Sequence, residues 1–238
     1  MKNLLFYSLF ISTFSFFSQE TKQDTTRLQK LEEVIVSSIR VNQNAPIAFT
    51  NVSKDELGKK NLGQDLPILL NSLTSVVTTS DAGAGVGYTG IRIRGINAQS
   101  TNITINGIPY NDAESLGTFW VDLPDFASSV ENLQVQRGVG TSTNGSSAFG
   151  ASINILTDLI SKTPYFENSN SIGSYNTLKN TFKFSTGILN DYFEFSGRLS
   201  KIDSDGYIDR SSSDLKSYFL RVNYKKENTL IKALSFGG

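Results

Sequence analysis

The chain reads Ile91-Arg92-Ile93-Arg94-Gly95, then Asn102-Ile103-Thr104-Ile105-Asn106-Gly107-Ile108-Pro109-Tyr110, then Val130-Glu131-Asn132-Leu133-Gln134-Val135-Gln136-Arg137-Gly138, and finally Ala151-Ser152-Ile153-Asn154-Ile155-Leu156-Thr157. These short alternating runs are separated by glycine-rich turns and predict one small sheet between Tyr88 and Asp158. In the first run, a period of two places both isoleucines on one face and both arginines on the other. The Asn106-Gly107 pair predicts a hairpin, because a type I′ turn needs positive φ at both central residues.

Composition excludes several classes of function. The chain has 238 residues, no formal net charge, no cysteine and no histidine. A nucleic-acid partner is not expected, because phosphate binding needs a basic excess. Disulfides, cysteine-based metal sites and histidine-dependent catalysis are excluded within this sequence. We therefore predict no catalytic residue, no metal site and no cofactor.

The sequence contains two groups of aspartates that suggest catalysis or calcium binding, but the residues around them favour neither function. Asp122 and Asp125 lie at the start of a predicted short helix, Leu123–Ser129, where we expect them to act as helix caps. The aspartates at positions 203, 205 and 209 lack the spacing of an EF-hand calcium loop, so we expect a solvated surface loop there.

The N-terminus predicts an exported protein. A short basic start is followed by the apolar run Leu4–Phe17, which is too short to span a membrane comfortably, and then by polar residues. We predict a signal peptide over residues 1–18; a buried N-terminal helix is the alternative. Residues 19–41 should form a flexible tail, since most of this stretch is polar and aperiodic.

The tail contains one β-prone segment, Glu33-Val34-Ile35-Val36-Ser37. A short segment of this kind can add itself to the sheet edge of another protein, with backbone hydrogen bonds supplying the affinity. The alternative is an ordinary first strand of the domain that follows.

Two further patterns lie between the tail and the sheet. The leucines of Asn61–Leu73 recur at helical spacing and predict one amphipathic helix, with Pro67 tolerated in its first turn. Gly85–Gly90 matches G-x-G-x-x-G, but these glycines lead into a strand and not into the helix that a dinucleotide site requires. We expect a loop there.

Beyond Asp158 the pattern changes to longer alternating strands. Thr181–Ser185, Tyr192–Ser200 and Ser217–Tyr224 alternate, and in the first two an apolar or aromatic set opposes a polar set, which is typical of transmembrane barrel strands. A short turn at Leu189–Asp191 and a longer loop at Asp203–Ser211 match the two rims of such a barrel. A soluble β-sandwich is the alternative.

The order of these pieces resembles the plug domain of TonB-dependent outer-membrane receptors. The most specific part is a short helix, a strand ending in Arg137-Gly138, a Gly-Ser-rich turn containing Gly145 and Gly150, and a last strand. The resemblance implies an α+β plug domain over residues 42–158, made of a small mixed sheet with short helices. The first strands of a transmembrane antiparallel β-barrel would follow over residues 159–238. Such barrels have about 22 strands, so this barrel is truncated.

The resemblance also implies site residues and partners. Glu33, Val34, Ile35, Val36 and Ser37 resemble the TonB box, which binds the periplasmic domain of TonB. Three arginines stand where the family has plug arginines facing acidic residues of the barrel wall; the alternative is that they are solvated strand arginines. They are Arg92, Arg94 and Arg137.

The function that this resemblance implies is active uptake of a scarce solute through the cell outer membrane, gated by the plug. The solute would be a ferric siderophore, haem, cobalamin or an oligosaccharide, and outer-membrane lipid would surround the barrel. A secreted β-rich binding or adhesion protein is the alternative function.

Overall fold

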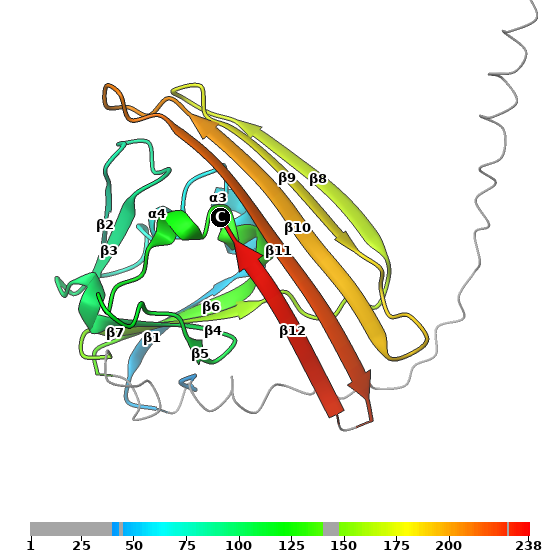
Figure 1. Cartoon of the computed structure of the whole chain (residues 1–238). Coiled ribbons are helices and arrows are strands. Elements are labelled where there is room, and N and C mark those ends of the chain that lie inside the picture. The colour runs from blue at the N-terminus through cyan, green and yellow to red at the C-terminus, as the bar shows by residue number, and fades with distance from the viewer. Residues whose placement is uncertain (1–39, 43–44, 140–147, 228) are drawn as a thin grey trace, which may run out of the picture. The chain divides into compact units, whose positions relative to one another are not determined.

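The computed structural model describes residues 40–42, 45–139, 148–227 and 229–238 (Figure 1). The predicted signal peptide and the box-like segment lie outside these residues. All described residues belong to one compact unit, Glu33–Gly238. We call residues 42–158 the plug region and residues 159–238 the strand region.

A mixed five-stranded sheet forms the base of the plug region. Its spatial order is β1 (Ala48–Ser53), β6 (Val130–Arg137), β7 (Ala151–Thr157), β4 (Thr101–Ile105) and β5 (Ile108–Pro109). The β4–β7 pair is parallel and the other pairs are antiparallel. Asn106 and Gly107 join β4 to β5 with φ of 50° and 85°, which confirms the predicted hairpin.

The prediction that Ile91–Arg94 joins this sheet is wrong. β3 (Thr89–Ile93) pairs with β2 (Val76–Ser80) in a separate two-stranded sheet. Arg94 follows the strand with φ of 54°, and the chain turns so that Ile93 bridges to Ile96. Alternation correctly identifies the buried face, since Ile91 and Ile93 are buried, but it carries no information about which strand is the neighbour.

The helices of the plug region are short. α3 (Lys54–Lys60) begins with a capping box in which Ser53 and Glu56 satisfy each other's backbone N–H groups. α4 covers only Leu66–Leu69, with Pro67 in its first turn, so the predicted helix over Asn61–Leu73 is too long. Gly63 has φ of 125° before α4, and Ser75 has φ of 65° after it. Three 3₁₀ turns complete the region: η1 (Ala98–Ser100), η2 (Trp120–Asp122) and η3 (Phe126–Ser129).

Within the described ranges, no helix is long and apolar enough to cross a membrane.

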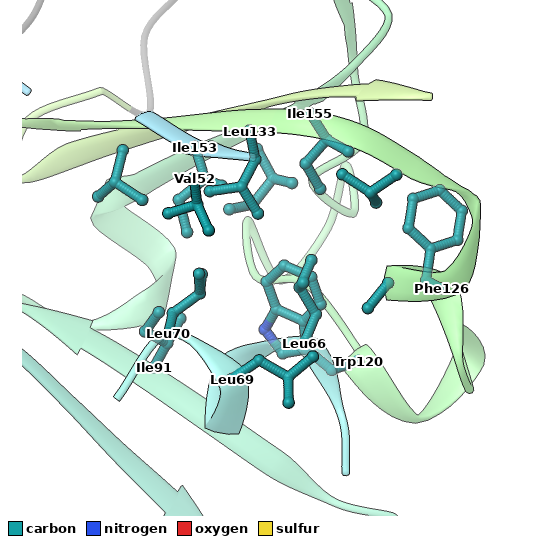
Figure 2. Packing of buried hydrophobic residues seen from close by; sticks show 14 of the residues in the cluster. Val52, Leu66, Leu69, Leu70, Ile91, Trp120, Phe126, Leu133, Ile153 and Ile155 are labelled. Carbon is teal, nitrogen blue, oxygen red and sulfur yellow. The ribbon is translucent and has the colours of Figure 1, made fainter. Parts of the chain in front are cut away.

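One apolar core lies between the sheet and the elements packed on it (Figure 2). Leu133, Ile153 and Ile155 contribute from the sheet, and the leucines of α4 contribute from the opposite side. Trp120 and Phe126 extend the core through η2 and η3. Full burial of each of these side chains stabilises the fold by about 1.5–3 kcal/mol. The core therefore holds η3 in place at the surface where the strand region packs.

The strand region is a five-stranded antiparallel sheet in which sequence neighbours pair. Its strands are β8 (Tyr165–Ile172), β9 (Leu178–Ser185), β10 (Phe193–Ser204), β11 (Ser213–Lys226) and β12 (Thr229–Gly237). β10 and β11 contain 12 and 14 residues, enough for a tilted strand to span a bilayer. The sheet is not closed: β8 and β12 are its two edges. This arrangement confirms the predicted fold class, a plug-like α+β region followed by antiparallel strands, here in an open sheet.

Candidate functional site

The inner face of the strand region is polar and buried. On β9 the lysines at 179 and 183 are buried, whereas Phe182 between them is 38% exposed. The same alternation continues on β10, where Arg198 is 2% exposed and Leu199 is 51% exposed. This confirms the predicted division into a polar and an apolar face. The polar face is buried because it lies against the plug region.

Asp125, at the N-terminus of η3, is the centre of the contact between the two regions. Its Oδ1 lies 2.8 Å from the Nζ of Lys179, and its Oδ2 lies 3.4 Å from Nη1 of Arg198. Four neutral groups donate to the same carboxylate over 2.6–3.0 Å: Asn61, Ser128, Thr181 and Ser200. The carboxylate is fully buried, and both of its oxygens are satisfied by several donors.

The electrostatics of Asp125 follow from these contacts. Burial by itself raises the pKa of Asp125, but the charges of Arg198 and Lys179 outweigh it and hold that pKa well below its usual range. Asp125 is therefore ionised at neutral pH. Its φ of 52° is left-handed, a conformation that Asp and Asn tolerate better than other non-glycine residues. The expected role of Asp125 as a helix cap is wrong, since its side chain makes no capping hydrogen bond.

A second charge cluster surrounds Asp158, at the junction of the two regions. Its carboxylate lies 2.6 Å from the Nζ of Lys54 in α3 and 3.1 Å from the Nζ of Lys183 in β9. Burial alone raises the pKa of Asp158, but Lys183 and Lys54 together lower it below its ordinary value. Arg221 of β11 donates to the backbone carbonyls of Asp158 and Leu159.

Arg221 connects this cluster to a third buried carboxylate. Its Nη2 lies 3.0 Å from Oε1 of Glu194 on β10. Ser185 also donates to Glu194 over 2.9 Å, and Asn223 donates to its other oxygen. Asp125, Asp158 and Glu194 therefore each make charge-assisted contacts with the inner face of β9, β10 and β11.

A cavity of about 150 Å³ opens between these contacts. It lies against α3 and η3 on one side and against β8 and β9 on the other. Its charged lining residues are Lys54, Glu167, Lys179 and Lys183. Three of these are lysines already paired with carboxylates, so the cavity is a polar gap in the contact surface. The described residues contain no group of acidic side chains that could hold a metal ion.

The three arginines singled out from the sequence lie elsewhere. Arg92 and Arg94 are exposed, and Arg137 donates to plug-region atoms, the carbonyl of Thr74 and the hydroxyl of Thr50. Burial, with the charge of Arg94 nearby, lowers the pKa of Arg137. Among the described residues, no ion pair includes any of the three. Their contact with an acidic barrel wall stays a prediction.

Among the described residues, the three ion pairs that join the two regions have the opposite polarity to the predicted contact of plug arginines with an acidic wall. The plug region supplies Asp125 and Asp158, and the strands supply lysine and arginine. Sequence reasoning placed Lys183 of β9 on the polar face but could not find its partner. One signal in the sequence pointed to a partner for such strand cations: Asp125 is a carboxylate that lies between a proline and an apolar run.

At one end of the molecule, loops from both regions meet. The connection between β10 and β11 rests on the glycine-rich loop before β3, because the N–H groups of Tyr207 and Ile208 both donate to the carbonyl of Ala82 over 2.8 and 3.2 Å. Tyr207 stacks edge-on against Tyr175 and is 66% exposed, and Tyr88 is 64% exposed. Exposed aromatic rings therefore gather where the two loops touch.

Comparison with known proteins agrees with this architecture. Residues 41–152 match the family model described as the TonB-dependent receptor plug domain. The chain is 29% identical to the vitamin B12 transporter BtuB of Vibrio vulnificus over 182 residues, which cover 76% of this chain and 27% of the transporter. It is 24% identical to the ferrienterobactin receptor of Escherichia coli over 208 residues, which cover 80% of this chain and 28% of the receptor. The chain thus spans less than a third of these relatives.

Solved structures show the same fold. The siderophore receptor PirA of Acinetobacter baumannii superimposes with a TM-score of 0.58 at 19% identity, over 79% of this chain and 31% of PirA. FpvA of Pseudomonas aeruginosa, solved with bound pyoverdines, superimposes with a TM-score of 0.65 at 13% identity, over 81% of this chain and 25% of FpvA.

Proposed function

We propose that this chain, which contains a region matching the plug domain of TonB-dependent receptors, is the N-terminal part of an outer-membrane receptor that takes up a scarce solute. The uptake would be active and gated by the plug region. The relatives are named for vitamin B12 and for ferrienterobactin. We propose a solute of the same kind, a metal chelate or corrinoid too large for simple diffusion.

The observation that carries this proposal is the polar contact surface between the plug region and the strands. Asp125 and Asp158 of the plug region form ion pairs with Lys179, Lys183 and Arg198 of the strands. Water can replace each such partner when the surfaces separate, whereas an apolar contact of the same size would resist hydration. A plug held this way is stable at rest and can still move. In a soluble sandwich, the alternative fold, the inner faces would be apolar.

The mechanism that we propose is mechanical. Solute binds at the end where the exposed tyrosines gather, on the loops of both regions. TonB captures Glu33–Ser37 from the periplasm by adding that segment to its own sheet edge. A pull on the tail then loosens the plug region from the polar face of β9–β11. The outer face of these strands, with Phe182 and Leu199, contacts lipid.

A pull-down tests the coupling segment. The mature N-terminal part of the chain is offered to the periplasmic domain of TonB, with and without Ile35→Pro, which removes a backbone N–H needed for strand addition. A matched control, Thr25→Pro, places the same residue elsewhere in the tail. We expect capture by the wild type and the control and loss of capture with Ile35→Pro. Capture that survives Ile35→Pro would refute the box assignment.

A further inference from the structure

The contact between the plug region and the strand region has an apolar part, on the side of β11 and β12. Phe219 and Phe236 lie opposite each other on these strands, and both rings meet Phe126 of η3 edge-on, with centroids 6.1 and 5.5 Å away. Tyr110 also lies against Phe236, with 5.9 Å between the ring centroids. Separation here would expose aromatic surface to water, so this part of the contact resists opening.

The part of the contact that faces β8 and β9 is polar and incompletely filled. The cavity of about 150 Å³ lies here, and Lys179 and Lys183 line it. A polar cavity of this size has room for water, which can take over the hydrogen bonds of these lysines when the surfaces separate. We therefore expect the plug region to part from the strands first along β8 and β9, so that a passing solute meets this stretch of the wall.

The wall that this separation uncovers is cationic. Lys179, Lys183 and Arg198 have their ion-pair partners in the plug region, where Asp125 and Asp158 supply the carboxylates. The hydrogen bonds that the structure shows for these three side chains also end on plug-region atoms, namely the carbonyls of Asn61, Pro124, Asp125 and Ser128 and the hydroxyl of Ser128. When the plug region moves away, all three cations lose these partners.

The acidic side chains of the strands do not cancel this charge. Among the strand-region residues that the structure describes, Glu194 is the one buried carboxylate, and it is already paired with Arg221. Glu167 of β8 lies opposite Lys183 in register, but it is exposed. Cations therefore outnumber carboxylates on this stretch of the inner face. A passage lined in this way attracts anions and repels cations.

We propose that the solute is an anion, a metal chelate with a net negative charge, and that Lys179, Lys183 and Arg198 bind it as it passes. The chelate takes the place that Asp125 and Asp158 occupy while the plug region is seated. This inference rests on the proposed function and narrows its class of solute, since a neutral corrinoid gains nothing from such a wall. Anionic oxygen atoms accept charge-assisted hydrogen bonds from the same amine and guanidinium groups, so the three cations are not left unpaired while the plug region is displaced.

Uptake by cells that make the full-length receptor, with and without TonB, tests the charge of the solute. The probes are an iron(III) tris-catecholate, which is an anion, an iron(III) tris-hydroxamate, which is neutral and has the same metal and coordination number, and neutral cyanocobalamin. We expect TonB-dependent uptake of the tris-catecholate and of neither neutral probe.

Three variants test the wall itself. Lys183→Gln should slow uptake of the anion about fivefold, the effect of one unit charge about 4 Å away in water. The Kd of the anion at the cell surface should stay the same, because Lys183 is buried in the contact with the plug region. Asp158 keeps its ion pair with Lys54 in this variant, so the plug region stays seated. Lys183→Arg keeps the charge and should keep the rate of uptake, and Lys216→Gln, at an exposed lysine of β11, is the matched control.

A second measurement needs no solute. The full-length receptor is placed in a planar lipid bilayer, moderate urea loosens the plug region, and the reversal potential in a KCl gradient reports whether Cl⁻ or K⁺ passes more easily. Lys183→Gln should lower the preference for Cl⁻ relative to wild type and to Lys216→Gln. Equal reversal potentials in the three proteins would overturn the role of the wall.

The two proposals fail in different ways. TonB-dependent uptake of either neutral probe in preference to the anion overturns the inference about charge and leaves the proposed function standing. Uptake that is the same with and without TonB, or the absence of uptake of all three probes, counts against the proposed function. The reversal potentials then still decide whether this wall selects anions.

Discussion

Replacing Asp125 by asparagine should loosen the plug region from the strands by about 3–5 kcal/mol, the cost of breaking a buried charge pair by removing one partner. The change is nearly isosteric, and asparagine tolerates the left-handed backbone at this position, where φ is 52°. The substitution therefore removes the charge and keeps the conformation. What remains is Lys179 and Arg198, 3% and 2% exposed, without their shared carboxylate.

The structure also bounds this magnitude. Lys179 still donates to the carbonyl of Asn61 and to the hydroxyl of Ser128, which the substitution leaves in place. Arg198 stays charged but still donates to the backbone carbonyls of Pro124 and Asp125, which the substitution leaves in place. A value much above 5 kcal/mol is therefore not expected.

Amide hydrogen exchange of η3 measures the effect. The N–H of Phe126 bonds to the carbonyl of Leu123, and that of Ser128 bonds to the carbonyl of Asp125, so both amides report opening of this turn. A loss of 3 kcal/mol corresponds to about 150-fold faster exchange. The matched control is Asp122→Asn, which makes the same chemical change at an exposed aspartate nearby.

A double-mutant cycle completes this test. Combining Asp125→Asn with Lys179→Gln should cost less than the sum of the two single changes, because the second change removes one stranded charge. Equal effects of Asp125→Asn and the Asp122→Asn control, or a strictly additive cycle, would refute the idea that Asp125 holds the strands to the plug through charge.

Three further outcomes follow from the same structure. Burial raises the pKa of Asp65 to about 7, and hydrogen bonds from Thr89 and the backbone only partly oppose this increase. The folded state therefore binds the proton more tightly than the unfolded state does. The free energy of unfolding should fall by at most about 4 kcal/mol as pH rises from about 4 to 7. Asp65→Asn should remove that slope in urea unfolding at pH 5 and pH 8. Gly150→Ala would place a methyl group 2.6 Å from Cβ of Ile96 and should cost about 1–3 kcal/mol, with recovery of packing in the double variant Gly150→Ala, Ile96→Gly, which removes that Cβ. Glu194→Gln should cost about 3–5 kcal/mol by removing the carboxylate that pairs with the buried Arg221, and a urea midpoint equal to that of wild type would contradict this.

Much of the fold is predictable from local sequence. The Asn106-Gly107 hairpin follows from a turn that only a few residue types adopt. The inward direction of Lys179 and Lys183, and the outward direction of Phe182, follow from the period of two in an extended chain. Such features depend on residues close together in the sequence, so a short window contains the information.

Other features could not be predicted in this way. The leucines around α4 have helical spacing, but the helix covers only Leu66–Leu69, and the backbone at Gly63 and Ser75, within the predicted range or just beyond it, has positive φ that a continuous helix excludes. Ile91 and Ile93 alternate like the strands of the main sheet, yet their strand pairs with β2. In both cases most of the buried side chains were correctly identified, although Leu62 is 57% exposed. The helix boundaries and the neighbouring strand were not.

By itself, the sequence determined which side chains face inward, where the main turns occur, and that a plug-like domain precedes barrel-like strands. Only the tertiary structure decided that Asp125 meets Lys179 and Arg198, 54 and 73 residues further along the chain, and that Val41 meets Gln134. The reason is physical. Backbone geometry sets the face of each residue within a few positions, whereas a partner across two sheets depends on how the whole chain closes around its core.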